Sequence, residues 1–339
     1  MGRFQDISVV ILNYNTKQYL EQFLPLVKAY SEDAKIVVAD NCSDDGSAAF
    51  IETHHPDVQL VNNPENLGFC AGYNYSLSLL ENKYFLLLNS DIEVTPNWLE
   101  PMYELMESDE TIACCQPKIK SYSEKEKFEY AGAAGGMIDF LGYPFSRGRV
   151  FDELEVDKGQ YEGSADIFWA TGASLLIRAD LFKSFKGFDE FFFAHMEEID
   201  LCWRLKNAGY RVCYTSKSEV FHIGGGTLSK SSPRKTFFNF RNALVILVKN
   251  LPFFRLVPIM FIRLVLDGVA GLRFLMLGEG KHCWAIAKAH LSIYKNIFLL
   301  LQKRKMVEGK KSFLTFQEVC KKSIVWQHFV LGKKTYRDF

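Results

Sequence analysis

The stretch Tyr84-Phe-Leu-Leu-Leu-Asn-Ser-Asp-Ile-Glu93 is the one around which the rest of the chain is organised. A short, unbroken apolar run that ends in polar residues is typical of a strand buried on both faces of a parallel sheet. Asn89, Ser90 and Asp91 then lie at the carboxyl end of that strand, where ligands bind in open α/β sheets. An amide and a carboxylate spaced in this way can hold a hard divalent cation, or can form a turn by bonding their own backbone.

Strand and helix patterns alternate before this strand. The expected strands cover residues 7–12, 36–39 and 59–62, and the expected helices cover residues 17–27, 48–54 and a segment that ends near residue 82. This alternation predicts parallel strands joined by right-handed crossovers. Side chains that follow the strands should therefore share one edge of the sheet.

The first strand is followed by the turn Asn13-Tyr-Asn-Thr16, which contains no glycine. A dinucleotide-binding fold needs a glycine-rich turn at this point so that the backbone can approach the pyrophosphate. The sequence also lacks a Walker A motif. Both common phosphate-binding motifs are thereby excluded.

A nucleotide could still be bound along this edge. Tyr14 could stack on a base, Asp40 could bond its edge, and the turn from Gly68 to Gly72 could lie near the phosphates, with a metal ion at Asp91. Each residue also has a structural interpretation: Tyr14 as a core aromatic, Asp40 as part of a turn, and the two glycines as sites of close packing. The functional interpretation is favoured because these residues follow adjacent strands.

A cluster of acids opens the predicted helix near residue 197. In the simpler interpretation, Glu197, Glu198 and Asp200 stabilise the helix dipole and have no other role. They also lie near the aromatic run 191–193 and Trp203, where crowding and partial desolvation should raise a carboxyl pKa into the range of a general base. We therefore favour a catalytic role for these acids.

The middle of the chain is less regular. A helix is expected over residues 96–106, with Pro96 in its first turn, and a strand over residues 173–177. Residues 119–163 are rich in glycine, tyrosine and charge without a steady period, which predicts loops that close over a substrate or a disordered insertion. Trp169 and Trp203 are candidate acceptor-binding aromatics, although a packed tryptophan is the commoner outcome.

A further strand is expected over residues 211–215, followed by His222 and three glycines. A histidine beside apolar residues is usually a satisfied core residue. Here the glycines allow close approach, and the imidazole could complete the coordination of a cation at Asp91.

Composition limits the classes of partner. The 339 residues carry 40 basic and 40 acidic side chains, so the overall charge does not indicate a nucleic-acid binder. Eight scattered cysteines without a Cys-x-x-Cys pair indicate reduced thiols in a cytosolic setting. The first residues lack the apolar run of a signal peptide, so the catalytic part is expected to stay on the cytoplasmic side.

The carboxyl-terminal region is expected to be helical over residues 235–249 and strongly apolar over 253–277, where four charges make a membrane span improbable. Amphipathic helices lying on a membrane surface are favoured, with a basic cluster for anionic lipid at Lys303, Arg304, Lys305, Lys310 and Lys311. The alternative is an ordinary packing layer or a dimer face, so a homo-oligomer is possible.

Seven motifs together resemble the family 2 glycosyltransferases of the GT-A fold, in the branch of rhamnosyl- and galactofuranosyl-transferases. They occur in the family's order over residues 5–230 and cover residues 10–15, 38–47, 66–72, 88–91, 171–173, 197–204 and 222–225. The resemblance implies an α/β fold with a Rossmann-like, mostly parallel sheet flanked by helices. The domains would be a catalytic unit at 1–232, divided near residue 118 into nucleotide-sugar and acceptor halves, and a helical region at 233–339.

The resemblance also implies a function. It is an inverting transfer of a sugar from a UDP- or dTDP-linked donor to a hydroxyl of a glycan or lipid-linked acceptor, in cell-surface polysaccharide synthesis at the inner face of the plasma membrane. The cofactor would be Mn²⁺ or Mg²⁺ at Asp91 and His222, and the base Glu198, with Glu197 and Asp200 left open. The nucleotide-sugar residues would be Asn13, Tyr14, Asn15, Asp40, Asn66, Gly68, Gly72, Asn89 and Ser90.

Two other functions remain open from the sequence. A sugar-nucleotide pyrophosphorylase should carry a glycine-rich basic loop after the first strand, which is absent. A catalytically inactive sugar-nucleotide or glycan-binding protein would not need the acids at 197–200.

Overall fold

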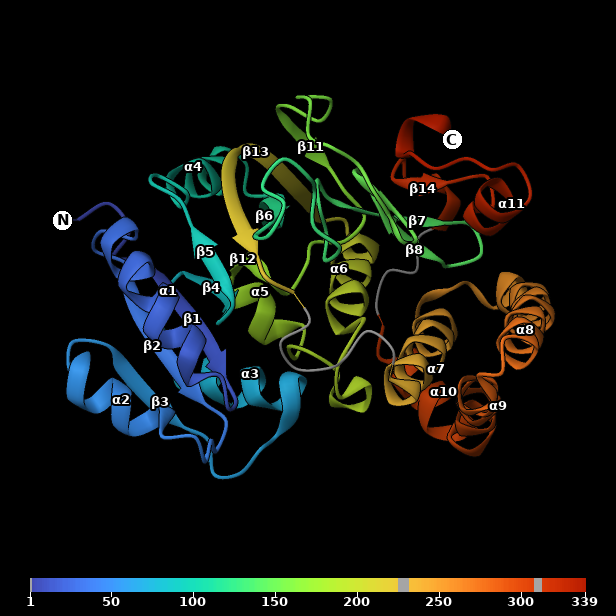
Figure 1. Ribbon diagram of the computed structural model, residues 1–339, viewed down its shortest axis with the longest axis horizontal. Coiled ribbons are helices and arrows are strands. Elements are labelled where there is room, and N and C mark those ends of the chain that lie inside the picture. Colours follow the sequence, from blue (N-terminus) through green and yellow to red (C-terminus); the bar gives the residue numbers. More distant parts are fainter. Residues whose placement is uncertain (1, 225–231, 308–312) are drawn as a thin grey trace.

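The computed structural model describes residues 2–224, 232–307 and 313–339. Over these residues the chain forms a nine-stranded sheet flanked by helices, a smaller five-stranded sheet, and a group of carboxyl-terminal helices (Figure 1). The α/β class predicted from the alternating pattern is confirmed. Gly225, Lys310 and Lys311 lie outside the described residues.

The amino-terminal half of the large sheet is parallel, in the order β3-β2-β1-β4. All four predicted strands are present, and the three helices that connect them lie where expected, although the third ends at residue 78. The elements are β1 (Ile7–Asn13), α1 (Lys17–Tyr30), β2 (Lys35–Asp40), α2 (Ser47–His54), β3 (Gln59–Asn62), α3 (Gly68–Ser78) and β4 (Tyr84–Asn89).

Strand β4 is buried on both faces, as its continuous apolar sequence predicts. Phe85 and Leu87 belong to one core cluster with α3, whereas Leu86 and Leu88 belong to a second cluster with α1. The strand register places Asn13 beside Asp40 and Leu12 beside Asn89. The three strand ends that carry the predicted site therefore lie next to one another.

The other half of the sheet is mixed. β12 (Ser174–Arg178) is antiparallel to β4, and the strands beyond it are β6 (Ile112–Ser121), β13 (Arg211–His222) and β11 (Ser164–Asp166), with β5 (Ile92–Val94) paired to β13. The predicted strand at 211–215 continues to His222, which pairs with Ile92. This pairing brings His222 beside Asp91, from a point 131 residues away.

The helices of this half are α4 (Glu100–Ser108), α5 (Ala179–Ser184), a 3₁₀ turn η1 (Glu190–Phe192) and α6 (Glu197–Ala208). The prediction that Pro96 begins a helix is wrong. Residues 95–98 form a turn, closed by the Trp98 amide donating to the Thr95 carbonyl, with a positive φ at Asn97. The helix begins only at Glu100, with Pro101 in its first turn.

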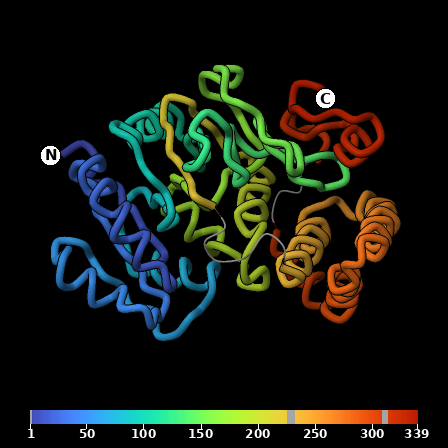
Figure 2. Tube along the Cα trace, in the orientation of Figure 1, coloured from blue at the N-terminus to red at the C-terminus, as the bar shows by residue number. Residues whose placement is uncertain are grey.

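The prediction of loops or disorder over residues 119–163 is also wrong, because this segment builds the second sheet. Its strands are β7 (Gly136–Asp139), β8 (Pro144–Ser146), β9 (Arg149–Val150) and β10 (Glu153–Leu154). The fifth strand, β14 (Val319–Cys320), pairs in parallel with β7. Figure 2 shows the carboxyl-terminal segment, in red, returning beside this green part of the chain.

The carboxyl-terminal region is helical, as predicted. It contains α7 (Pro233–Asn250), α8 (Phe253–Met276), α9 (Gly280–Lys295), α10 (Ile297–Lys305) and α11 (Ile324–Phe329), with short turns η2 (Phe313–Thr315) and η3 (Tyr336–Asp338). Residues 244–248 of α7 are buried in the same core cluster as α3 and α6. Helix α7 is therefore part of the core that also contains α3 and α6. Among the described helices, none is both long and apolar enough to span a bilayer.

Candidate active site

The ends of β1 and β2 are joined by a buried polar network. The Asn13 side-chain amide donates to Asp40 Oδ1 over 2.8 Å, and the Ser43 hydroxyl donates to the same oxygen over 2.6 Å. The Ser43 backbone amide donates to Asp40 Oδ2 over 2.8 Å, and Thr16 Oγ1 lies 2.9 Å from Ser90 Oγ. The first, second and fourth strand ends are thus fixed relative to one another before any ligand binds.

Tyr14 and Asn15 project from this network. Tyr14 is 38% exposed, so it is not a core aromatic and its ring is available to a ligand. Asn15 has a φ of 53° and is held by its own side chain, which accepts a hydrogen bond from the Asp44 amide at 2.9 Å. The positive φ turns the backbone away from the strand direction and presents Tyr14 at the sheet edge.

Asn41 organises the neighbouring turn, and the sequence did not single it out. Its side chain donates to Asn66 Oδ1 at 2.9 Å and to the Gly68 carbonyl at 3.1 Å, and it accepts from the Leu67 amide at 3.1 Å. A Cβ on Gly72 would lie 3.1 Å from a Leu12 methyl carbon and 3.3 Å from Asn41 Oδ1. Gly72 thus allows α3 to pack on β1, which is the close-packing interpretation.

Asp91 and His222 form a buried ion pair. His222 Nε2 lies 3.2 Å from Asp91 Oδ1, and Nδ1 lies 3.1 Å from Glu129 Oε2, a partner that the sequence did not indicate. Burial opposes the charged imidazole, but the two carboxylates outweigh it and raise the pKa of His222 to about 10. Burial likewise opposes the charged form of Asp91, but His222 outweighs it and lowers the pKa of that carboxyl. Asn89 Nδ2 lies 3.5 Å from His222 Nε2.

The donor set at this point suits a divalent cation. A carboxylate oxygen and an imidazole nitrogen face each other; the oxygen is a ligand that suits Mn²⁺ and Mg²⁺, whereas the nitrogen suits transition metals and not Mg²⁺. With its pKa near 10, the imidazole of His222 favours the charged form between the two carboxylates. Among the described residues, no group of three or more His, Cys, Asp or Glu side chains has the arrangement of a complete metal site. Asp91 and His222 would therefore supply only part of a shell.

The predicted acid cluster follows a strained loop. Phe193, His195 and Met196 have φ values of 66°, 69° and 70°, a region that non-glycine residues rarely adopt. Helix α7 holds this loop. The fully buried Asn242 donates from its side chain to the carbonyls of Phe192, Ala194 and His195 at 3.2, 2.8 and 2.7 Å.

Arg241 adds to this restraint. Its guanidinium donates to the carbonyls of Phe191 and Phe192 at 2.8 and 2.7 Å. Two consecutive residues of α7 thus donate hydrogen bonds to four carbonyls of the loop before Glu197, those of Phe191, Phe192, Ala194 and His195. The backbone that carries the acids is fixed by a helix from the carboxyl-terminal part of the chain.

Glu197 and Glu198 are the chemically unusual acids. Oε2 of each side chain is buried without a hydrogen-bond partner among the described residues. Burial raises the pKa of Glu198 to about 7, and burial together with the Glu198 charge raises the pKa of Glu197 well above its usual range. Glu197 is 4% exposed, whereas part of Glu198 reaches the surface. Of the two residues Glu198 has the larger exposed surface, and its Oε2 is nevertheless buried.

Asp200 does not fit the role of a base. It is fully buried, and its Oδ2 pairs with Lys249 Nζ and Arg204 Nε, each at 2.8 Å, while Asn250 donates to Oδ1 at 3.0 Å. Burial opposes its charge, but Lys249 and Arg204 outweigh it and lower the pKa of the carboxyl. We correct its assignment to a structural one, because both carboxylate oxygens already have charged or amide partners.

The two candidate acceptor tryptophans are packed. Trp203 has no exposed surface and stacks on Phe313 with ring centroids 4.5 Å apart. Trp169 is 5% exposed, and its Nε1 donates to the Met137 carbonyl at 2.8 Å. Neither ring is available to an acceptor in this structure, so both assignments are corrected to packing roles.

Two observations indicate that the loop before the acid pair lies near the start of α3. A Cβ on Gly68 would lie 3.1 Å from the Phe193 ring. Burial and the charges of Glu197 and Glu198 raise the pKa of the Cys70 thiol, so the acids lie close to the first turn of α3. The Asn89 amide donates to the Ala173 carbonyl at 2.9 Å, which links the end of β4 to the segment before β12.

Residues 8–160 match the model of the family described as glycosyl transferase family 2. The chain contains a family 2 glycosyltransferase domain. In this glycosyltransferase the matched range includes the ends of β1, β2 and β4, whereas the acid pair and α7 lie beyond it. The resemblance inferred from the seven motifs is confirmed.

Curated relatives and solved structures agree with this assignment. N-acetylglucosaminyl-diphospho-decaprenol L-rhamnosyltransferase of Mycobacterium tuberculosis is 25% identical over 235 residues, which cover 64% of this chain and 75% of that protein. Rhamnosyltransferase WbbL of Escherichia coli is 24% identical over 227 residues, covering 64% and 83%. GalNAc-T7, solved with UDP, GalNAc and Mn²⁺, matches with a TM-score of 0.56 at 15% identity, covering 74% of this chain and 48% of that one. This likeness shows the GT-A fold.

Proposed function

We propose that the protein transfers a sugar from a UDP- or dTDP-linked donor to a hydroxyl of a glycan or lipid-linked acceptor, with inversion at the anomeric carbon, in cell-surface polysaccharide synthesis. The observation that carries this proposal is the acid pair at the start of α6. A carboxyl with a pKa of about 7 and an unpartnered oxygen is suited to accept a proton at neutral pH. Two curated relatives whose names describe rhamnosyltransferases support the reaction class.

The proposed reaction is a single displacement. Glu198 accepts the proton of the acceptor hydroxyl at a carboxylate oxygen while the hydroxyl oxygen attacks the anomeric carbon, and the bond to the nucleoside diphosphate breaks on the opposite face. Glu197 lies beside Glu198 in the first turn of α6, and burial together with the Glu198 charge raises the pKa of the Glu197 carboxyl. Tyr14 would stack on the nucleotide base, and Asn13, Asn15, Asp40, Asn66, Gly68, Asn89 and Ser90 would form the surrounding donor site.

Asp91 and His222 are proposed to hold Mn²⁺ or Mg²⁺, with Glu129 behind the imidazole. When bound, such a cation supplies positive charge that stabilises the departing diphosphate. Loading requires His222 to lose its proton, so Glu129 would orient the neutral imidazole through Nδ1. GalNAc-T7, which shares the fold, was solved with Mn²⁺, and this likeness supports a divalent cation as the cofactor.

A donor panel tests this proposal. Calorimetry with UDP-, dTDP- and GDP-sugars in the presence of Mn²⁺ should show binding that Asp91→Ala abolishes or strongly weakens, while the variant keeps the wild-type far-UV circular dichroism. Asp180→Ala, which removes an exposed carboxylate on α5, is the matched control. Fully active Asp91→Ala would remove this residue from the mechanism.

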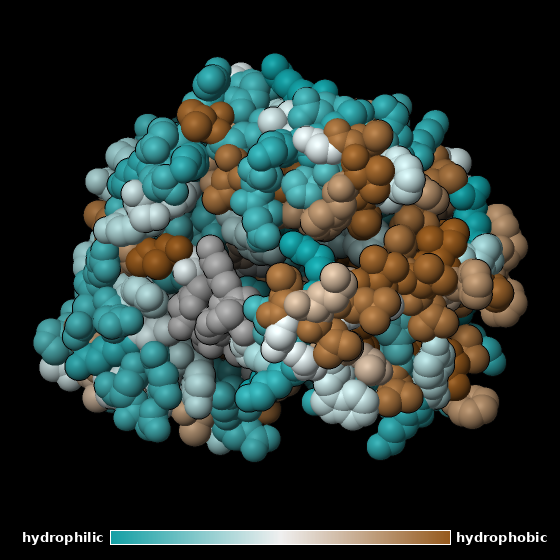
Figure 3. Space-filling view, turned by 45° about the vertical axis from the view of Figure 1, so that its right-hand side comes forward, coloured by the Kyte–Doolittle hydropathy of each residue, from teal (hydrophilic) through white to brown (hydrophobic). Residues whose placement is uncertain are grey.

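Peripheral membrane contact is part of the proposal. Helix α8 carries apolar side chains on its exposed face at three- and four-residue spacing, and they are more than half exposed: Phe254, Val257, Phe261, Val265, Val269, Leu272 and Met276. Figure 3 shows hydrophobic side chains gathered over the helical side of the molecule. A face of this kind is typical of a helix that lies in a membrane interface. An inner-leaflet location would give access both to cytoplasmic donors and to a lipid-linked acceptor.

Vesicle flotation tests the membrane contact. The double variant Phe261→Glu/Met276→Glu should lose binding to vesicles that contain phosphatidylglycerol. Leu79→Glu, which places one negative charge on an exposed apolar residue far from α8 in the sequence, should keep it. Equal flotation of both variants would contradict membrane docking through α8.

A further inference from the structure

The last helix, α11, and the residues after it carry large apolar side chains on the surface. Trp326, Phe329, Val330 and Leu331 are 57%, 55%, 56% and 53% exposed, whereas Ile324 at the start of the helix is 1% exposed. The helix therefore packs through Ile324, and its other large apolar side chains lie on the outside. We call residues 326 and 329–331 the terminal patch. Contiguous exposed apolar surface of this kind indicates an interaction site.

The terminal patch is fixed to the second sheet. Strand β14, which precedes α11, pairs in parallel with β7. The Ile324 amide donates to Oδ2 of the fully buried Asp139, which ends β7, at 3.0 Å. The Phe329 ring also lies 4.9 Å from the Phe151 ring, measured between centroids. The patch is thus a held surface of the folded protein.

The apolar face of α8 lies on the same side of the molecule. Arg273, in the last turns of α8, has its guanidinium carbon 5.7 Å from the centroid of the Phe329 ring. Its neighbours Leu272 and Met276 are 60% and 88% exposed. Figure 1 shows α8 and α11 at the right-hand side, and the hydrophobic side chains in Figure 3 gather there. The apolar surface of α8 therefore reaches the terminal patch.

Basic residues border the terminal patch in the sequence. The pairs Lys321-Lys322 and Lys333-Lys334 flank it, and residues 319–339 contain five Lys and Arg against one acid, Asp338. The wider region 233–339 contains 20 Lys and Arg against 5 Asp and Glu. Apolar side chains that include a tryptophan, bordered by lysines, suit the boundary between lipid chains and anionic head groups.

A second copy of the chain fits this surface less well. In a symmetric dimer the same patch of both copies meets at the interface. The lysine pairs beside the terminal patch would then face the lysine pairs of the other copy, and like charges across an interface disfavour association. Charge complementarity therefore favours an anionic bilayer over self-association.

We infer that the terminal patch is a second membrane-docking element, which enters the interface of an anionic bilayer beside α8. Trp326, Phe329 and Leu331 would lie among the upper lipid chains, and the flanking lysines would lie at the head groups. The inference rests on the proposed function for the contact through α8. It adds an attachment point that belongs to the second sheet and not to the helical group.

Two attachment points have a consequence that one helix does not provide. A single amphipathic helix in a membrane leaves the protein free to rotate about the helix axis. The terminal patch lies off the axis of α8 and is joined to the second sheet through β14 and Asp139. Docking through both elements would therefore fix one orientation of the protein, and so of its active site, relative to the bilayer.

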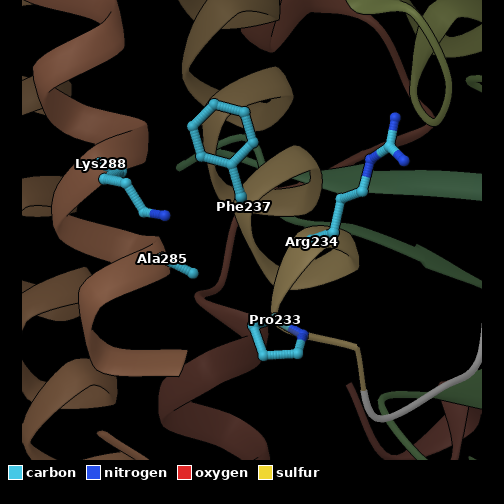
Figure 4. A pocket seen from close by; sticks show the side chains of 5 residues that line it. All are labelled: Pro233, Arg234, Phe237, Ala285 and Lys288. Carbon is cyan, nitrogen blue, oxygen red and sulfur yellow. The ribbon is translucent and has the colours of Figure 1, made fainter. Parts of the chain in front are cut away.

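The tryptophans of the chain allow a direct test. Trp326 and Trp284, which is 58% exposed on α9, are the two that lipid could reach. Figure 4 shows the neighbouring Ala285 facing α7 across a pocket of about 280 Å³, and Trp284 is not one of the described residues that line this pocket. The other three are at most 5% exposed: Trp98, Trp169 and Trp203.

The test uses full-length Trp284→Phe, in which Trp326 is the remaining exposed tryptophan. Its fluorescence is measured with vesicles of phosphatidylglycerol and phosphatidylcholine, the latter brominated on its acyl chains near the head group. The emission should shift to shorter wavelength, and the brominated lipid should quench it. Trp284→Phe/Trp326→Phe is the matched control and should show neither change. Vesicle binding by Trp284→Phe without quenching would overturn the inference.

Affinity for the same vesicles gives a second readout. Trp326→Ser/Leu331→Ser should weaken vesicle binding by about tenfold, because two apolar side chains no longer enter the lipid. Trp326→Phe/Leu331→Met, which keeps both side chains apolar, should bind as the wild type does. Equal affinities of the two double variants would contradict docking through the terminal patch.

Sedimentation without vesicles examines the other occupant. The wild type should sediment as a monomer, and a dimer that Trp326→Ser/Leu331→Ser dissociates would overturn the inference and assign the patch to a second copy. Quenching of Trp326 requires neither turnover nor a donor. Quenching without sugar transfer would therefore refute the proposed function alone, whereas sugar transfer by a protein whose Trp326 is never quenched would refute the terminal patch alone.

Discussion

Replacing Asn242 by alanine should separate catalysis from donor binding. The side chain makes three contacts of 2.7–3.2 Å with carbonyls of the loop that precedes Glu197. A buried carbonyl left without its donor costs roughly 1–3 kcal/mol. The loop also contains Phe193, His195 and Met196 at positive φ, each worth about 1–3 kcal/mol of strain. Without Asn242 this strain is no longer offset, and the loop should relax.

The expected result follows from the change in the acid pair. If the productive position of Glu198 becomes less favourable by about 1.4–3 kcal/mol, kcat falls roughly 10- to 100-fold. Water that reaches the relaxed loop reduces the burial that raises the pKa of Glu198 to about 7, so the pKa should fall toward 4.5. A base works when deprotonated, so activity should rise with pH through about 7 in the wild type and at a lower pH in the variant.

The assay is initial-rate transfer from the best donor between pH 4.5 and 9, with donor affinity measured by calorimetry. The donor affinity should change less than kcat, because Asn242 acts on the donor site only through Phe193, whose ring lies near Gly68. Asn296→Ala is the matched control, since its side chain donates only to the Ser292 carbonyl within α9. Asn242→Ala with wild-type kcat and an unchanged pH profile would refute the role of α7 in placing the acids.

Three further predictions concern stability and the turn of α3. Lys249→Met leaves Asp189 and Asp200 buried without their shared cation, so it should reduce the free energy of unfolding by about 3–5 kcal/mol in a denaturant titration. Lys303 is a partly exposed partner of Asp189, so Lys303→Met should reduce the free energy of unfolding by less than about 1 kcal/mol in the same experiment. Burial opposes the charge of Asp189, but the two lysines outweigh it and lower the pKa of the carboxyl from 3.8 to about 2. The charged Asp189 therefore contributes about 2 kcal/mol to the free energy of unfolding above pH 3.8, and this contribution is lost as the pH falls through 2. Asp189→Asn should make the melting temperature depend less steeply on pH in this acid range. Gly68→Ala should weaken nucleotide binding, because this residue has a φ of +74° and its Cβ would lie 3.1 Å from an aromatic ring; unchanged calorimetry would contradict the tight approach at this turn.

The amino-terminal half of the fold was predictable because its signals are local. The apolar run that ends at Asn89 and the strands before it fix their own secondary structure, and parallel pairing then brings Asn13, Asp40 and Asp91 to one edge. The second sheet was not predictable. Strands β9 and β10 have two residues each, and β7 pairs with β14 about 180 residues later, so no sequence period marks them.

The site was likewise predictable only in part. The sequence identified the acids at 197–200 as a group but could not distinguish them, because all three occupy the first turn of one helix. The distinction comes from Lys249, which neutralises Asp200, and from the absence of such a partner near Glu198 among the described residues. The sequence did not indicate Asn242 or Glu129, because neither belongs to a motif and each contacts residues that are tens of positions away in the chain.

The central claim is that Glu198 accepts the proton of the acceptor. The most direct measurement is the rate of sugar transfer by Glu198→Gln, which keeps the shape of the side chain and removes its basic oxygen, compared with Glu197→Gln across the same pH range. Glu198→Gln should bind the donor normally and transfer no sugar, whereas Glu197→Gln should retain transfer with a displaced pH profile. Transfer by Glu198→Gln at the wild-type rate would contradict it.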